Sequence, residues 1–255
     1  MRITDKFSEL KTKNESALII YLTGGFPTIE ESIENIRRVA EAGADIIEVG
    51  IPFSDPIADG KVIQYSSNIA ISGGATLEKI IDSLRDVKID IPLVIMSYIN
   101  PLIAYGKERL FKKLNEIGIS GLIIPDLPVE ESEEWKMLSK KFGVDMIFLV
   151  SPTSPEERIR KIAEYSEGFI YCVSVKGTTG ERNELPKDTD KYIERVKNNT
   201  NKPVAFGFGI SNEKQIELLR DKVDGIIIGS RVIKGIIGGE DITNLIKNFK
   251  EKTRC

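Results

Sequence analysis

The stretch ALIIYLTGGFPTIEESIENIRRVAEAGADIIEV, residues 17–49, decides the fold. Two short runs rich in Ile, Leu and Val, 17–22 and 45–49, flank a longer segment, 29–42, in which apolar residues recur at helical spacing. The two runs are too short for helices and are apolar at successive positions, as strands buried on both faces of a parallel sheet are. Gly43 follows the amphipathic segment, and glycine commonly ends a helix. The stretch therefore predicts a strand, a helix and a second, parallel strand.

The same alternation continues to the end of the chain. Further strand-like runs lie at 92–96, 121–124, 146–150, 169–173, 204–206 and 225–228. Amphipathic helical segments lie at 130–142, 155–165, 189–197 and 212–219, and a short additional one at 4–10. Eight strand–helix units in 255 residues are typical of the α/β class (β/α)8, or TIM, barrel. A doubly wound open sheet is the alternative, but it rarely has eight such units in this length.

The chain shows no sign of a domain boundary. No Pro/Gly/Ser-rich linker, charge run or shift in composition divides it. We therefore predict one TIM-barrel domain over residues 1–255, with the short extra N-terminal helix covering the lower end of the barrel.

Composition narrows the class of protein. Hydrophobic residues make up 41% and charged residues 29%, which is typical of a soluble globular protein. The net charge of −3, without a strongly basic stretch, disfavours nucleic-acid binding. No apolar run is long enough to span a membrane, and the first residues lack the apolar core of a signal peptide. Cys172 and Cys255 lie far apart and predict no disulfide framework. We expect a cytoplasmic protein that contacts neither membrane nor nucleic acid.

The chain contains no histidine. This excludes a Ser-His-Asp triad, a Cys-His pair, a histidine metal site and acid–base catalysis by imidazole. Any acid–base chemistry must therefore use carboxylates, Lys, Tyr or Cys.

Two carboxylates occupy unusual places near the second strand. Glu48 interrupts an apolar strand close to its carboxyl end, the end at which TIM barrels place their active sites. Burial there would raise its pKa, whereas Asp59, at the expected start of the next helix, would be kept ionised by the helix dipole. Two carboxyl groups in unlike surroundings can serve as acid and base. The alternative is a hydrogen-bonded structural Glu and a helix-capping Asp.

Glycine-rich motifs follow the last two strands. Gly207-Phe208-Gly209 follows the seventh and Gly229-Ser230-Arg231 the eighth, where phosphate-binding barrels build their anion site. Glycine lets backbone N–H groups approach phosphate oxygens, and the start of a helix adds partial positive charge. Simple turns are the alternative for the glycines, and surface solvation is as plausible as phosphate binding for Arg231.

Residues 174–187 include Lys176-Gly177-Thr178-Thr179-Gly180 and show no apolar periodicity. The segment is longer than a usual strand–helix connection, which favours a lid that closes over substrate. An irregular surface loop is the alternative.

The segment EVGIPFSDPIADG, residues 48–60, closely resembles the signature of the tryptophan synthase alpha chain family. Further similarity to the family lies at 22–27, 98–101, 125–131, 171–180 and the two glycine motifs. The chain departs from common family residues at Phe26, Lys61, Thr178 and Arg231.

The resemblance implies retro-aldol cleavage of indole-3-glycerol phosphate to indole and glyceraldehyde 3-phosphate. Glu48 would then be the main acid–base group, Asp59 would stabilise charge at the indole N–H, and Tyr171 would lie near both. Thr179 would be the lid residue that orders Asp59. The phosphate site would comprise Gly180, Gly209, Gly229 and Ser230. The indole pocket would be lined by Tyr21, Met96, Ile123, Leu149 and Phe208, although each is equally compatible with plain core.

The resemblance also implies a partner. A pyridoxal phosphate-bearing beta subunit would receive the indole for L-tryptophan synthesis in an α2β2 tetramer, while the alpha chain itself would need no cofactor or metal. The docking surface would include Pro52, Asp55, Pro56 and Pro128. Two other functions stay open: a stand-alone indole-3-glycerol-phosphate lyase, and a non-catalytic phosphate-binding barrel subunit. An isomerase on a related barrel is disfavoured because its usual motifs are absent.

Overall fold

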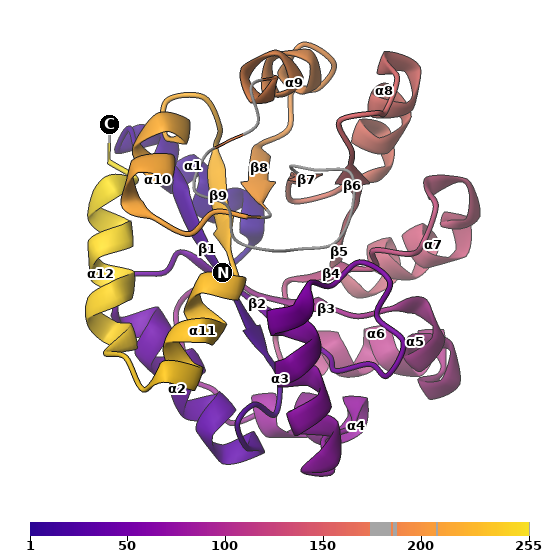
Figure 1. Cartoon of the computed structure of the whole chain (residues 1–255). Helices are drawn as coiled ribbons and strands as arrows, with labels where there is room; N and C mark the ends of the chain where they lie inside the picture. Colours follow the sequence, from indigo (N-terminus) through magenta and orange to yellow (C-terminus); the bar gives the residue numbers. More distant parts are fainter. Residues whose placement is uncertain (174–184, 186–187, 208, 255) are drawn as a thin grey trace.

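The computed structural model describes residues 1–173, 185, 188–207 and 209–254. Within them, nine parallel strands form a nearly closed barrel that is surrounded by helices (Figure 1). The predicted (β/α)8 class and the extra N-terminal helix are confirmed. The strands are β1 (Ala17–Thr23), β2 (Ile46–Gly50), β3 (Leu93–Met96), β4 (Gly121–Ile123), β5 (Asp145–Ile147), β6 (Leu149–Val150), β7 (Ile170–Val173), β8 (Val204–Gly207) and β9 (Gly225–Ile228).

The fifth predicted strand is broken in two. The sheet order β5-β4-β3-β2-β1-β9-β8-β7-β6 leaves only the junction of β5 and β6 unpaired, and these are consecutive pieces of the run predicted at 146–150. At the break, the Phe148 N–H donates to the Ser166 hydroxyl over 3.3 Å instead of to a neighbouring strand. The Phe148 carbonyl still accepts from the Tyr171 N–H over 3.1 Å, so the ring closes through this residue.

The helices form the outer layer. They are α1 (Ile3–Thr12), α2 (Ile29–Glu41), α3 (Lys61–Ser72), α4 (Leu77–Leu84), α5 (Ile99–Tyr105), α6 (Lys107–Glu116), the 3-10 turn η1 (Val129–Glu131), α7 (Glu133–Phe142), α8 (Glu156–Tyr165), α9 (Thr189–Lys197), α10 (Glu213–Leu219), α11 (Ser230–Gly238) and α12 (Ile242–Lys252). The helix predicted at 130–142 is divided into η1 and α7, which meet at Ser132. Thr28 caps α2, since its side chain accepts a hydrogen bond from the Glu31 N–H.

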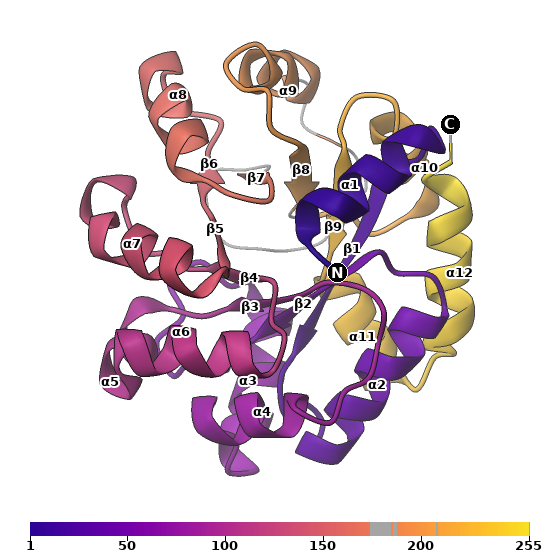
Figure 2. The same cartoon turned by 180° about the vertical axis from the view of Figure 1, so that it is seen from behind.

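Alternate strand residues face two different cores. One set packs outward against the helices, and the other fills the barrel interior together with Ile3, Phe7 and Leu10 of α1. Figure 2, the view from behind, shows α1 in front of the barrel end opposite to that seen in Figure 1. Apolar side chains fill this end of the barrel interior, and TIM barrels place their active sites at the opposite end, where the strands have their carboxyl ends.

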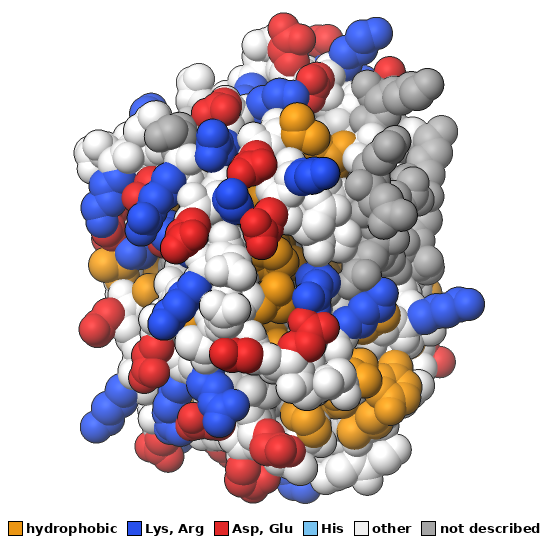
Figure 3. Space-filling view, turned by 60° about the vertical axis from the view of Figure 1, so that its left-hand side comes forward, with side chains coloured by type: hydrophobic (Ala, Val, Ile, Leu, Met, Phe, Trp, Pro, Cys, Tyr) orange, Lys and Arg blue, Asp and Glu red, His pale blue; other side chains and the backbone are white. Residues whose placement is uncertain are grey.

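One face of the surface is seen in Figure 3. Lys and Arg side chains are interspersed there with Asp and Glu, and apolar side chains gather in one area at its lower right. Among the described residues, no helix combines the length and apolar character needed to cross a membrane.

An ion cluster fastens the last helix to the amino-terminal end of the barrel. The Lys250 ammonium, on α12, lies 2.9 Å from an Asp45 carboxylate oxygen and 2.8 Å from one of Glu15. Asp45 also accepts a hydrogen bond from the Leu18 N–H over 2.7 Å, at the start of β1. The side chains of Lys250, Asp45 and Glu15 are only 14%, 9% and 16% exposed, so loss of the ammonium would leave two carboxylates poorly solvated.

Lys250→Met is therefore expected to lower the free energy of unfolding by about 3 kcal/mol, because it leaves mostly buried charges without their partner. Urea denaturation at neutral pH measures the change. Lys252→Met is the matched control on the same helix: Lys252 pairs with Glu217 at the surface, where solvent screens the charges, and its loss should change the stability little. Equal effects of the two substitutions would contradict this account of the cluster.

Candidate active site

A cavity opens at the carboxyl ends of the strands, where TIM barrels place their active sites. Its lining comes from β1, β2, β3, β7, β9, α3 and α11 and from the loops after β2 and β8: Tyr21, Glu48, Asp59, Ile63, Met96, Tyr171, Gly209, Ile210, Ile227, Gly229 and Ser230. Both predicted catalytic carboxylates therefore face the same cavity.

Glu48 is a carboxyl group inside an apolar barrel. Its strand position pairs with Tyr21 of β1 and Val94 of β3, and its side chain is 1% exposed. Neither carboxyl oxygen has a hydrogen-bond partner among the described residues. Burial, with a smaller contribution from the charge of Asp59, raises the pKa of Glu48 to about 8. The group is therefore mainly protonated at neutral pH and can act as an acid, as the sequence predicted.

Asp59 lies at the cavity on the loop between β2 and α3, two residues before the helix begins at Lys61. The expectation that the helix start would hold its pKa down is wrong. Burial raises the pKa of Asp59 to about 6, and a hydrogen bond from the Tyr98 hydroxyl opposes that rise. Desolvation outweighs the effect of the helix dipole because Asp59 lies outside the helix, one residue before the N-cap Gly60. Asp59 is nevertheless mainly ionised at pH 7, so the two carboxyl groups differ in protonation as expected.

Glycines at strand ends make room for two tyrosine rings in the cavity wall. A Cβ at Gly50 would lie 2.1 Å from the Tyr21 hydroxyl, and one at Gly207 would lie 3.1 Å from the Tyr171 ring. A Cβ at Gly229 would come within 3.1 Å of Tyr21. These positions therefore need glycine for packing, a reason that the sequence did not reveal for Gly207 and Gly229. Burial raises the pKa of both tyrosines, so they stay neutral.

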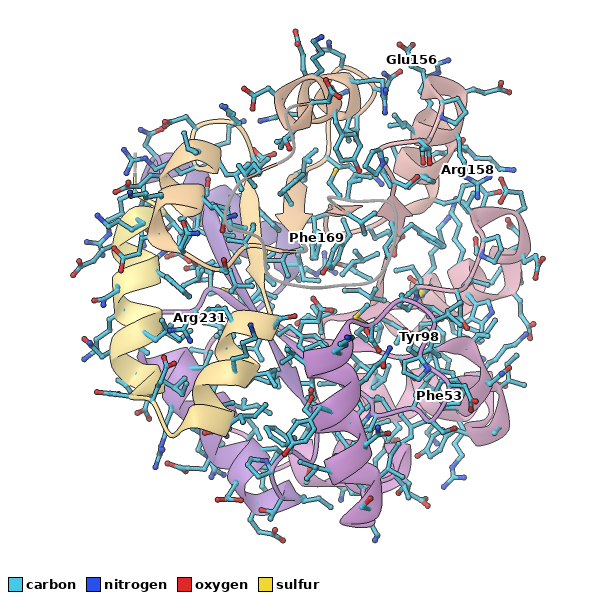
Figure 4. All side chains as sticks on the ribbon, viewed as in Figure 1. Phe53, Tyr98, Glu156, Arg158, Phe169 and Arg231 are labelled. Carbon is cyan, nitrogen blue, oxygen red and sulfur yellow. The ribbon has the colours of Figure 1, made fainter. Side chains whose placement is uncertain are left out.

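The residues predicted to bind phosphate can be located relative to the cavity. Gly209, Gly229 and Ser230 border it, and α11 starts at Ser230 with no acidic residue in its first turn. Backbone N–H groups at a helix start attract a phosphate group. Arg231, labelled in Figure 4, does not border the cavity, and its guanidinium pairs with Glu240 over 2.6 Å.

The other predicted pocket residues divide into three groups. Met96 borders the cavity, but Ile123 and Leu149 belong to the apolar interior without bordering it. The predicted lid residues Thr179 and Gly180, and Phe208, lie outside the described residues. Sequence reasoning assigned no role to Ile63, Ile210 and Ile227, which border the cavity, or to Tyr98, which contacts Asp59. Apolar residues carry no sequence signal for a pocket, whereas Tyr98 stands directly after a strand end, where a polar residue merits inspection.

The fold and cavity define a class of barrel enzyme in which a protonated carboxyl group, an ionised carboxylate and a helix start border one cavity. The model of the family described as "Tryptophan synthase alpha chain" matches residues 7–254. Proteins of that name from Carboxydothermus hydrogenoformans and Methanosarcina mazei are 43% and 44% identical, each over 99% of this chain and 93% of their own length. A Mycobacterium tuberculosis tryptophan synthase structure superposes with a TM-score of 0.95 at 32% identity, covering 100% of this chain and 98% of its own. The chain belongs to the tryptophan synthase alpha chain family, as its resemblance predicted.

The raised pKa of Glu48 makes stability depend on pH. In the unfolded chain the carboxyl group ionises near its ordinary pKa of 4.5, whereas in the folded chain it keeps its proton until about pH 8. Wild-type stability is therefore lost as the pH rises through this window, by about 1.4 kcal/mol per pH unit. Glu48→Gln should gain stability relative to wild type between pH 5 and pH 8, measured by urea unfolding.

The exposed Glu41→Gln is the control and should follow the wild-type curve. Parallel curves for wild type and Glu48→Gln over this range would show that Glu48 is ionised in the folded protein.

Proposed function

We propose that the cavity cleaves indole-3-glycerol phosphate to indole and glyceraldehyde 3-phosphate, with Glu48 and Asp59 as its catalytic residues. Membership of the family makes the chain a lyase of tryptophan biosynthesis. The observation that supports the residue assignment is that a protonated carboxyl group, an ionised carboxylate and a helix start border one cavity. Those three groups match the three parts of the substrate: the carbon to be protonated, the indole N–H and the phosphate.

Protonation by Glu48 starts the reaction. The proton goes to indole C3, which turns the ring into an indolenine whose nitrogen can accept an electron pair. The bond from C3 to the glycerol carbon then breaks, and its electrons restore the indole ring. The hydroxyl on that carbon loses its proton to the Glu48 carboxylate and becomes the aldehyde. One proton is given and one is taken back, so the step needs no external acid or base.

Asp59 would stabilise the positive charge that develops at the indole nitrogen. An ionised carboxylate in an apolar cavity interacts strongly with such a charge. Tyr171 borders the same cavity and would hold the ring between the two acids, while Tyr21 and Met96 would contact its faces. Gly209, Gly229 and Ser230 would bind the phosphate, and Thr179 and Gly180 stay predictions for the lid.

Glu48→Gln is expected to abolish indole release while a substrate-like phosphate ester still binds, because only the proton transfer is removed. Asp59→Asn should lower kcat/KM by at least about 10-fold, because the neutral amide cannot stabilise the indolenine charge. Indole release and calorimetric binding measure the two effects, with Glu41→Gln as control. Wild-type turnover by Glu48→Gln would refute its assignment.

We further propose that the indole passes to a tryptophan synthase beta subunit in an α2β2 assembly. Of the predicted docking residues, Asp55 and Pro128 are exposed, and Pro52 and Pro56 are half-buried. Ile57, which the sequence interpretation did not single out, is 75% exposed beside them. An exposed apolar side chain on a proline-stiffened loop is suited to protein contact. Pyridoxal phosphate would reside on the beta subunit alone, and we place this single-domain chain in the cytoplasm.

A stand-alone lyase would have the same cavity but no partner, and a non-catalytic subunit would bind phosphate esters without releasing indole. Glu48 favours catalysis over mere binding, because burying an unpaired carboxyl group costs stability without helping a scaffold. The assay with and without a beta subunit separates the three functions.

Ile57→Lys is expected to weaken the complex with a beta subunit at least about 10-fold, because it places a charge in the docking surface. Gel filtration at micromolar concentration and calorimetry measure the change. Leu218→Lys on α10 is the control, since Leu218 is 58% exposed and lies outside the proposed surface. If wild type and beta subunit do not co-elute, the chain is a stand-alone enzyme.

A further inference from the structure

Tyr98 lies behind Asp59 and holds it by its hydroxyl group. The hydroxyl accepts a hydrogen bond from the Ala58 N–H over 2.9 Å and donates one to the Asp59 carboxylate. Tyr98 is only 5% exposed and does not border the cavity, so it touches the proposed catalytic group without reaching the substrate. One hydroxyl thus fixes both the backbone and the side chain at the end of the loop after β2.

The backbone around Tyr98 is itself held on both sides. The Ser97 N–H donates to the Ile123 carbonyl over 3.0 Å, and the Ile99 N–H donates to an Asp126 carboxylate oxygen over 2.9 Å. Both partners belong to β4 and the loop that follows it. The backbone at Tyr98 is therefore fixed to the barrel by hydrogen bonds, whereas Asp59 belongs to a loop.

The ring of Tyr98 is positioned by Phe53. The ring centroids lie 5.4 Å apart at an interplanar angle of 33°, and Figure 4 shows the two side chains next to each other. Phe53 comes from the same loop as Asp59, six residues earlier. The loop therefore contacts Tyr98 at two points. The Phe53 ring packs against the Tyr98 ring, and Ala58 and Asp59 form hydrogen bonds with the Tyr98 hydroxyl.

We propose that Tyr98 is a positioning residue, which fixes the Asp59 carboxylate toward the cavity and thereby sets its orientation for the reaction. The inference rests on the proposed role of Asp59 but makes its own claim about how that side chain is held. A carboxylate on a loop has several rotamers, and the cost of selecting one during the reaction is removed when a neighbour selects it beforehand. Tyr98 also keeps the carboxylate ionised, because a hydrogen bond donated to the charged form favours that form.

Tyr98→Phe tests the proposal, because it removes the hydroxyl and keeps the ring packed on Phe53. We expect kcat to fall about tenfold or more, the range for a hydrogen bond to a charged group, with a smaller change in KM. The pKa of Asp59 should rise above its wild-type value of about 6. The acidic limb of the pH profile of kcat/KM, and the carboxyl titration of 13C-labelled Asp59 by NMR, should both move to higher pH.

Tyr105→Phe is the matched control, since it makes the same change on α5, where the Tyr105 ring contacts Arg109 instead of the cavity. Phe53→Leu is a second variant that keeps the hydroxyl but loosens the ring, and it should shift the Asp59 titration in the same direction by less. An unmoved Asp59 titration in Tyr98→Phe would overturn the proposal, whatever happens to the rate. If the wild-type protein releases no indole, the proposed function is refuted. A shifted Asp59 titration in Tyr98→Phe would still support the positioning role of Tyr98 in that case.

Discussion

The carboxyl group of Glu48, desolvated inside an apolar barrel, is the constraint on which the site depends. Its oxygens have no hydrogen-bond partner among the described residues, so the surroundings favour the neutral form. Such a group is stable only as an acid, and an acid is what a reaction begun by protonation requires. Burial provides most of this effect and the charge of Asp59 adds to it, in a chain that has no histidine.

The surroundings of the Asp59 carboxylate differ from those of Glu48. Asp59 lies on a loop, accepts a hydrogen bond from Tyr98 and keeps a lower pKa than Glu48, although burial acts on both. Two carboxyl groups of nearly equal intrinsic acidity are thereby separated into an acid and an anion. The glycines at the ends of β2, β8 and β9 leave space for two neutral tyrosine rings in the cavity wall.

Most of the barrel could be predicted because buried parallel strands leave a local signal. The runs at 17–22 and 225–228 differ from the observed strands by at most one residue. Two elements differ from their prediction: the fifth strand is broken at Phe148, whose N–H donates to Ser166, and the helix predicted at 130–142 is divided at Ser132. A serine hydroxyl can bond to solvent, to its own segment or to a distant one, and only the folded chain selects the partner.

By itself, the sequence determined which chemical groups the protein has for catalysis. It also determined where the strands end, because buried strands leave a local apolar pattern, and a carboxylate within such a pattern is easily recognised. It therefore located Glu48, Asp59 and the glycine turns at the mouth of a barrel. Only the tertiary structure decided the properties of these groups. The direction of the Asp59 pKa shift, the contact from Tyr98 and the separation of Arg231 from the cavity all depend on desolvation and on partners far away in the chain. Such quantities arise when segments meet in space, and no local pattern encodes them.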